Sequence, residues 1–508
     1  MNRPDAAIKV ADDQKGTVEF LAGSRAHGGK EPVERIDTHI SHVFLAGDRA
    51  LKLKRAVRFP YCDFSTTDKR RDACRRELEI NRRTAPGLYK VVASVNRDAD
   101  GRLSLDGPGE AIDWVVVMVR FDQSQLFDRL AETGGLDRTL MEDTAEAIAR
   151  FHDRAAILTA AGGAEAMAEV VAINRRSFAE SPEGTFEAEK LDRLASDSDR
   201  WIERLSARLD ARRARGRVRD CHGDLHLRNL VRLNGKPTLF DAIEFNERFS
   251  QIDVIYDLAF LLMDLDHRGL GDMGAGVLNR YLDIGGDDDG LATLPLFLSL
   301  RAAIRAHVTV AAGGTAVART YLDQALAYLT PPAPRLIAVG GLSGSGKSRL
   351  ALGLAPRLGP APGARVLRSD VLRKRLAGVP TFEPLGPQGY TPEMTTRTYE
   401  TLVETVGEAL GNGHSAIADA VFSRPAERAA IEQTAREVGV PFLGIWLDAP
   451  ADVRSDRVAD RHRDASDATP AVVRRQLGYD LGEIAWTRLQ AAGPFEETLA
   501  AARRVVGI

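Results

Sequence analysis

One segment in the last third of the chain combines glycines, a lysine and a serine at a spacing that binds phosphate. Residues 341–348 read GLSGSGKS and fit the pattern GxxxxGK[ST]. The glycines let successive backbone N–H groups turn toward phosphate oxygens, the lysine reaches the β- and γ-phosphates, and the last hydroxyl can ligate Mg²⁺. The residues predicted to bind ATP are Gly341, Ser343, Gly344, Ser345, Gly346, Lys347 and Ser348, with Lys347 also catalytic and Ser348 also a metal ligand.

The sequence around this segment favours an α/β domain. A buried-strand pattern precedes it at 336–340, and an amphipathic helix pattern follows at 348–358. Further strand patterns, separated by helical segments, predict a mostly parallel sheet. They occupy 364–368, 416–418, 442–447 and 504–508.

Two carboxylates follow strands of this predicted sheet. Asp370 comes after the strand at 364–368, and Asp419 ends the strand at 416–418. Ligands bind at the carboxyl ends of such strands, so either side chain could hold a Mg²⁺ water or accept a substrate proton. We assign Asp370 to catalysis and Asp419 to the metal. The alternative for each is a helix N-cap.

Three arginines share one predicted helical face further along the chain. Arg454, Arg457 and Arg461 are spaced three and four residues apart. Phosphoryl transfer needs positive charge over the transferred group, and a mobile lid supplies it while excluding water. We expect Arg457 and Arg461 to act in catalysis. The alternative is a surface helix whose arginines pair with Asp456 and Asp460.

A second constellation lies in the first part of the chain. Asp224 and Asn229 stand five apart, the spacing of a kinase catalytic loop. The turn pair Asn234-Gly235 predicts a hairpin in which paired positions sum to 469, so Asn229 faces Phe240 and Asp241 lies beside it. This predicts Asp224 as the base and Asn229 and Asp241 as metal ligands. Glu244 is a weaker ligand candidate.

The segment HGDLHLRN at 222–229, followed by a hairpin and an aspartate, resembles the signature of aminoglycoside phosphotransferases and related small-molecule kinases. The resemblance implies a bilobal α+β protein-kinase-like fold. It assigns Lys52 to ATP binding, with Lys54 as the alternative, and Glu77 as the partner of this lysine, with Glu79 as the alternative. Met118 would lie against the adenine. Residues 38–42 stand where such kinases carry a glycine-rich loop.

The last part resembles P-loop small-molecule kinases such as gluconate kinase, chloramphenicol phosphotransferase and zeta-toxin-like kinases. The residues that carry this resemblance are RSDVLRKRLAG at 368–378 and RVADRHRDASDA at 457–468. It implies a five-stranded parallel sheet and the use of ATP and Mg²⁺. The order of the two parts is similar to that of bacterial fusion proteins.

The prolines at 331, 332 and 334 predict a linker between the two parts. We therefore expect a kinase-like domain at 1–330, with a small lobe at about 1–120 and a large lobe at about 121–330. A linker at 331–334 and a P-loop domain at 335–508 would follow.

Composition narrows the range of functions. The 508 residues carry 69 basic and 72 acidic side chains, a net charge of −3, which argues against a general nucleic-acid or membrane binder. The three cysteines lack metal-binding spacing and suggest free thiols in a reducing compartment. The first residues carry no secretory signal, and the apolar stretch after Leu294 is interrupted by Arg301 and Arg305, so we expect a cytoplasmic protein.

These features together predict a bifunctional ATP-dependent kinase. Each domain would transfer the γ-phosphoryl group of ATP to a hydroxyl of a small molecule, with sugars as one acceptor class. Two alternatives stay open: a single catalytic domain regulated by a nucleotide-sensing partner domain, and a protein-modifying or toxin-like kinase.

Overall fold

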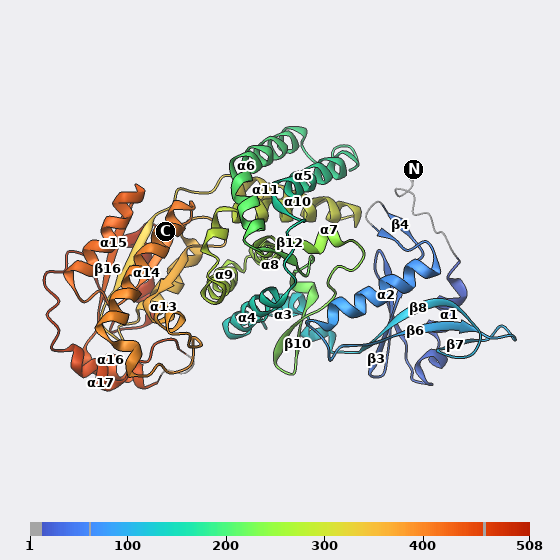
Figure 1. The fold of residues 1–508 in the computed structure, drawn as a ribbon, viewed down its shortest axis with the longest axis horizontal. Coiled ribbons are helices and arrows are strands. Elements are labelled where there is room, and N and C mark those ends of the chain that lie inside the picture. The colour runs from blue at the N-terminus through green and yellow to red at the C-terminus, as the bar shows by residue number, and fades with distance from the viewer. Residues whose placement is uncertain (1–12, 60–61, 461–463) are drawn as a thin grey trace. The chain divides into compact units, whose positions relative to one another are not determined.

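The computed structural model describes residues 13–59, 62–460 and 464–508. The chain divides into two compact units, residues 1–163 with 210–258 and residues 164–209 with 259–508. Figure 1 follows the chain through both units, which are described separately below.

The first unit is built around a six-stranded sheet in which every pair of neighbouring strands is antiparallel. Its strands, in spatial order, are β1 (Glu34–Asp37), β2 (Ser41–Ala46), β3 (Arg49–Lys54), β8 (Glu110–Val119), β6 (Tyr89–Arg97) and β7 (Leu103–Leu105). Alternation along the strands separates two apolar layers. Val115 and Val117 pack with Leu21 of helix α1 (Lys15–Ala22), whereas Val116 and Met118 pack with Cys74 of helix α2 (Thr67–Arg82).

The predicted hairpin of the first unit has the expected register. Strand β10 (Leu230–Leu233) pairs with β11 (Lys236–Leu239), and Leu230 lies opposite Leu239, which confirms that paired positions sum to 469. The Phe240 amide donates to the Asn229 carbonyl at 3.0 Å. The remaining elements of this unit are η1 (Ser24–His27), β4 (Arg58–Phe59), β5 (Cys62–Asp63), η2 (Gln123–Gln125), α3 (Phe127–Thr133), α4 (Arg138–Arg154), β9 (Val218–Asp220), η3 (Leu227–Asn229), α7 (Glu247–Ser250) and β12 (Gln251–Asp253).

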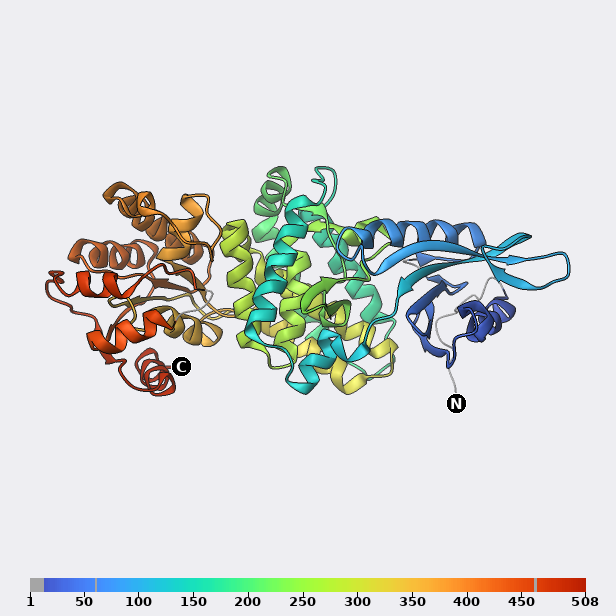
Figure 2. The same cartoon turned by 90° about the horizontal axis from the view of Figure 1, so that it is seen from below.

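The second unit contains a five-stranded parallel sheet, as predicted (Figure 2). Its strands, in spatial order, are β14 (Arg365–Arg368), β15 (Ala416–Asp419), β13 (Leu336–Gly340), β16 (Phe442–Asp448) and β17 (Thr487–Gln490). The predicted strand at 504–508 is wrong, because residues up to 506 form helix α18 (Phe495–Val506), whose Ala502 and Val506 pack into the core. The other helices of this domain are α12 (Lys347–Leu354), η5 (Ala355–Arg357), α13 (Ser369–Leu376), η6 (Pro387–Tyr390), α14 (Pro392–Gly411), α15 (Pro425–Val438), α16 (Ala451–Ala459) and α17 (Pro470–Gln476).

Helices that precede the proline segment also belong largely to the second unit. They are α5 (Gly163–Ala179), α6 (Ala188–Ala214), α8 (Val254–His267), α9 (Gly271–Gly285), η4 (Asp288–Ala292), α10 (Leu294–Ala311) and α11 (Thr315–Tyr328). Among the described residues, α10 has the length and apolar composition of a membrane span. However, 61% of it is buried inside the protein, as happens with core helices of globular domains.

Helix α9 closes the open edge of the parallel sheet within this unit. Strand β14 is an edge strand, and the Asn279 side chain serves the two backbone groups on its free side. Its Oδ1 accepts from the Val366 amide at 2.7 Å, and its Nδ2 donates to the Ala364 carbonyl at 3.0 Å. The buried Arg365 guanidinium pairs with Asp283 and Asp288, each at 2.7 Å. A side-chain amide thus takes the place of a neighbouring strand.

Candidate functional sites

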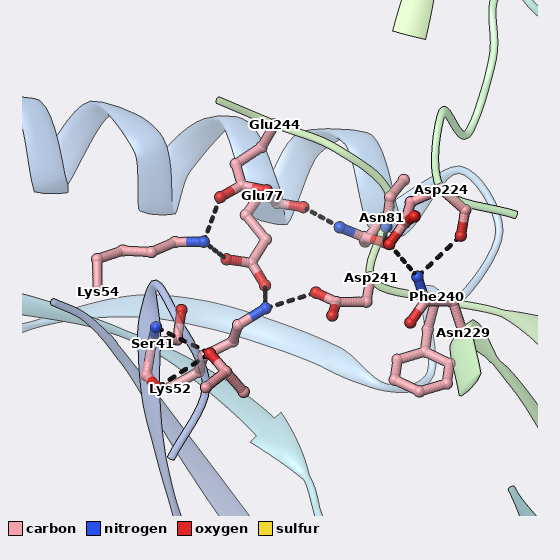
Figure 3. Close-up of polar contacts among 12 residues, drawn as sticks. Ser41, Lys52, Lys54, Glu77, Asn81, Asp224, Asn229, Phe240, Asp241 and Glu244 are labelled. Carbon is pink, nitrogen blue, oxygen red and sulfur yellow. Dashed lines mark hydrogen bonds and ion pairs between the residues drawn. The ribbon is translucent and has the colours of Figure 1, made fainter. Parts of the chain in front are cut away.

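The first site centres on Lys52 in the first unit (Figure 3). Its Nζ donates to Glu77 Oε1 at 2.7 Å and to Asp241 Oδ1 at 2.5 Å. Strand β3 supplies the lysine, helix α2 supplies the glutamate, and the residues after β11 supply the aspartate. Burial lowers the pKa of Lys52, but the carboxylates of Asp241 and Glu77 raise it well above its ordinary value. Lys52 therefore stays charged in the folded protein.

Lys54 extends this network away from Asp241. It is fully buried on the same face of β3, where its Nζ lies 2.5 Å from Glu77 Oε2 and contacts Glu244 Oε1 (Figure 3). The Glu244 carboxylate, the weaker candidate for a metal ligand, is thus paired with the buried Lys54. Glu79 is exposed and lies near Arg76, so Glu77 is the partner of the lysines.

The predicted catalytic loop places Asp224 beside Asn229. Asn229 Nδ2 donates to Asp224 Oδ2 and to the Asp224 carbonyl, both at 2.8 Å. Asp257 holds the start of this loop: its carboxylate accepts hydrogen bonds from the backbone amides of His222 at 3.1 Å and Gly223 at 2.8 Å. Gly223 has φ +83°, and a Cβ there would lie 2.7 Å from the Phe249 carbonyl oxygen, so this turn requires glycine.

This donor set fits a divalent cation. The Asn229 side chain uses its amide nitrogen to bond Asp224, so the amide oxygen of Asn229 is the atom that could ligate a metal. Asp241 supplies a carboxylate. Oxygen donors of this kind suit Mg²⁺. Met118 lies buried in β8 opposite Ala50, on the strand expected to border the adenine.

The second site is the phosphate-binding loop of the second unit. Gly341, Gly344 and Gly346 have φ values of +143°, +85° and +97°, which glycine adopts readily. A Cβ at Gly344 would lie 2.4 Å from the Arg454 carbonyl oxygen, so helix α16 packs directly against the loop. Lys347 Nζ donates to the Leu342 carbonyl at 3.2 Å. The loop opens into a cavity of about 1480 Å³.

Asp419 lies inside this cavity at the end of β15. Burial raises the pKa of the Asp419 carboxyl, while Arg368, Lys347 and a hydrogen bond from Ser348 oppose the rise. The structure therefore brings together the two predicted metal ligands, and a buried carboxylate beside a hydroxyl fits Mg²⁺. Arg368 lies 3.6 Å from Asp419, which gives this carboxylate a counterion when no cation is bound.

One side of the cavity is formed by α13 and the segment after it. Asp370 lies in the first turn of α13 and lines the cavity, as does Arg373 one turn later. The buried Arg373 donates to the Gly389 carbonyl at 2.9 Å and to Thr395 Oγ1 at 3.2 Å. Asp370 thus faces a polar space that a hydroxylated ligand can occupy.

The predicted arginine face is only partly present among the described residues. Arg457 lines the cavity, but Arg454 is buried, with its Nε donating to the Ala449 carbonyl at 3.2 Å. Arg461 lies outside the described residues. Of the described arginines of this face, Arg457 is therefore the one that lines the cavity.

Several residues around the cavity were not identified from the sequence. Asp467 accepts from Lys374 at 2.9 Å and from the Tyr390 hydroxyl at 2.8 Å, and Asp464 accepts from Arg368 at 2.7 Å. Gln476, at the end of α17, hydrogen-bonds Ser343 of the phosphate loop. No local pattern marks these positions, since each partner lies more than 70 residues away.

Comparison with known proteins finds one family match around each site. Residues 43–294 match the model of the phosphotransferase enzyme family, and residues 336–479 match that of an AAA domain. The protein named "Uncharacterized protein Rv2004c" of Mycobacterium tuberculosis (strain ATCC 25618 / H37Rv) is 31% identical over 489 residues, 92% of this chain and 94% of that protein. The adenylyl-sulfate kinase of Myxococcus xanthus (strain DK1622) is 31% identical over 114 residues, 22% of this chain and 57% of that enzyme.

A solved structure of choline kinase from Cryptosporidium parvum Iowa II is 11% identical, with a TM-score of 0.41, and the match covers 62% of this chain and 95% of that one. The two family matches and the M. tuberculosis relative, matched over 92% of this chain, show that the chain belongs to the phosphotransferase enzyme family and is an ATP-dependent phosphotransferase with a second, P-loop kinase domain.

Proposed function

We propose that the chain is a bifunctional kinase whose two sites each bind ATP with Mg²⁺ and phosphorylate a hydroxyl group of a small molecule. The observation that supports this proposal is that each site brings together the charged groups that phosphoryl transfer needs. The first combines Lys52, Glu77 and Asp241 with the pair Asp224 and Asn229. A domain that only sensed nucleotide would not need a carboxylate at the position of Asp224.

In the first site, Lys52 would bind the phosphates, and Asn229 and Asp241 would hold Mg²⁺, which neutralises charge on the phosphates during transfer. Asp224 would orient the acceptor hydroxyl and accept its proton. Its Oδ2 accepts from the Asn229 amide, which fixes the carboxylate beside the metal ligands.

In the second site, the loop amides and Lys347 would hold the phosphates, and Ser348 and Asp419 would hold the metal. Asp370 would orient the acceptor hydroxyl. Arg457 would contact the transferred phosphoryl group, and we extend this role to Arg461. Because the cavity wall carries aspartates, arginines and tyrosines, a polyhydroxylated acceptor such as a sugar fits it better than an apolar one.

We further propose that the division of labour follows the proline segment, with residues 1–330 carrying the first reaction and residues 335–508 the second. The three cysteines, Cys62, Cys74 and Cys221, are buried free thiols. Free thiols and a supply of ATP are typical of the cytoplasm, so we place both reactions there.

The test is calorimetric titration with a non-hydrolysable ATP analogue and Mg²⁺. We expect two sites in the wild-type chain and one in each of Lys347→Ala and Asp241→Ala. Glu79→Gln is the matched control, since Glu79 lies exposed on the same helix as Glu77. A single wild-type site that is lost with Lys347→Ala would refute the bifunctional proposal and leave the first domain without a nucleotide.

The acceptors require a separate screen over sugars, nucleosides and aminoglycosides, with each site disabled in turn. An acceptor used by one site should be phosphorylated by Lys347→Ala or by Asp224→Asn, but not by both. Labelling of a protein in place of any small molecule would favour a protein-modifying kinase.

A further inference from the structure

Gln476 makes a two-point contact with the phosphate-binding loop. Its Oε1 accepts from the Ser343 amide at 2.8 Å, and its Nε2 donates to Ser343 Oγ at 3.0 Å. The Gln476 side chain is 5% exposed, so water cannot easily replace these bonds. A primary amide is suited to this contact, because it offers one acceptor and one donor without bringing a charge toward phosphate.

Ser343 lies at the end of the loop where the outer phosphates belong. Lys347 Nζ, the group that reaches the β- and γ-phosphates, donates to the carbonyl of the preceding residue, Leu342, at 3.2 Å. Ser343 and Gln476 both line the cavity that also holds Asp370. The contact is therefore close to the place where a γ-phosphoryl group would meet an acceptor.

Helix α17 follows the segment that carries Asp464 and Asp467, and it contacts the loop through Gln476. Helix α16 precedes this segment and contacts the loop through the Arg454 carbonyl, which lies against Gly344. The two helices that bracket this segment thus both contact the loop. Arg475, which precedes Gln476, also lines the cavity.

We propose that Gln476 is a positioning residue for the γ-phosphoryl group: it stays bonded to Ser343 when nucleotide enters and fixes the outer turn of the loop. This inference rests on the proposed binding of ATP by the second site. Without Gln476, Ser343 loses these two hydrogen bonds and the turn can rotate away from the γ-phosphate. The inner part of the loop, from Gly344 to Ser348, is held by its own backbone and by α16 and should be unaffected.

The test compares two nucleotides in the Asp241→Ala chain, in which only the P-loop site remains. Gln476→Leu should weaken binding of the Mg²⁺ complex of a non-hydrolysable ATP analogue by about tenfold, as expected for the loss of hydrogen bonds beside a charged group. Its affinity for Mg²⁺ with ADP should stay within about twofold. Gln476→Glu should discriminate more strongly against the ATP analogue, because its carboxylate repels the γ-phosphate. Arg474→Leu, exposed on the same helix, should change neither affinity.

Equal losses for ADP and the ATP analogue would overturn the inference, since a purely structural role would affect both nucleotides. Unchanged affinities would overturn it as well. If Gln476→Leu does not fold, Gln476→Asn keeps the amide but shortens its reach, and the same selective loss is expected. If the Asp241→Ala parent itself binds neither ADP nor the ATP analogue at the P-loop site, the proposed function fails. That outcome differs from the one in which parent and variant bind equally well.

Discussion

The Asn279 side chain should control the local stability of the strand that leads to Asp370. Replacing it by leucine keeps the approximate size of the side chain but removes its hydrogen bonds with the Val366 amide, the Ala364 carbonyl and the Arg365 guanidinium. The Val366 amide and the Ala364 carbonyl, both in buried residues, would then lack partners. Each unsatisfied buried group costs about 1–3 kcal/mol, so the loss of both partners should make local opening of β14 easier by about 2–6 kcal/mol. Since about 1.4 kcal/mol is a factor of ten, amide exchange in this strand should accelerate at least about 30-fold.

The assay is native-state hydrogen exchange, read by mass spectrometry on peptides that cover residues 364–372. A whole-chain melting curve is less informative, because a chain with two compact units need not unfold in one step. Asn412→Leu is the matched control, because the Asn412 side chain bonds the Asp288 carbonyl at 3.2 Å and Arg208 at 2.6 Å, and not the backbone of β14. If Asn279→Leu leaves exchange of β14 unchanged in a folded chain, or if the control accelerates it equally, the Asn279 amide does not hold the strand edge.

Three further changes test other parts of the structure. Glu244→Gln should destabilise the first unit by about 2–4 kcal/mol, because the buried Lys54 loses a counterion, whereas the double change Lys54→Met with Glu244→Leu should cost less. Chemical denaturation compares the two chains, and a Glu244→Gln chain as stable as wild type would contradict the reasoning. Arg457→Ala should lower kcat about tenfold or more while the affinity for an ATP analogue changes little, and a collapse of that affinity at constant kcat would show that Arg457 binds the ground state. Burial lowers the pKa of His414 from 6.5 to about 4, so the unfolded chain takes up a proton before the folded chain does, and stability should fall as the pH drops through this range. The loss should approach about 3 kcal/mol near pH 4, and His414→Gln should remove that part of the pH dependence of unfolding.

The sequence predicted features that depend on short-range geometry. The Asn234-Gly235 turn determined the hairpin register, and the register placed Asp241 beside the hydrogen-bonded pair of Asn229 and Phe240. The conformation of the phosphate loop was equally predictable, because it is determined by glycines within eight residues. The pairing of Lys52 with Glu77 also agrees with the kinase resemblance.

Features that depend on single long-range partners were not predictable. Asn279 and Gln476 are isolated polar residues. Asn279 bonds Val366 and Ala364, and Gln476 bonds Ser343, each more than 80 residues away. The last strand was misplaced because β17 has only one buried residue, Leu489, while the apolar end of α18 looks like a strand when read without its helical period. The pairing of Lys54 with Glu244 could not be predicted, because the burial of these two charged side chains is seen only in the folded protein.

The charge balance around Lys52 bears on which form of nucleotide can enter the first site. Lys52 and Lys54 contribute two positive charges, and Glu77, Asp241 and Glu244 contribute three negative charges, so the cluster is net negative by one. Metal-free ATP would be repelled by Asp241, whereas ATP that arrives with Mg²⁺ brings a partner for that carboxylate and frees Lys52 for phosphate. The loop around Lys347 presents backbone amides and a lysine, and the nearby Asp419 already has Arg368 as a counterion. The two sites should therefore differ in their tolerance of a chelator: titration of free ATP should fill the P-loop site and leave the kinase-like site empty.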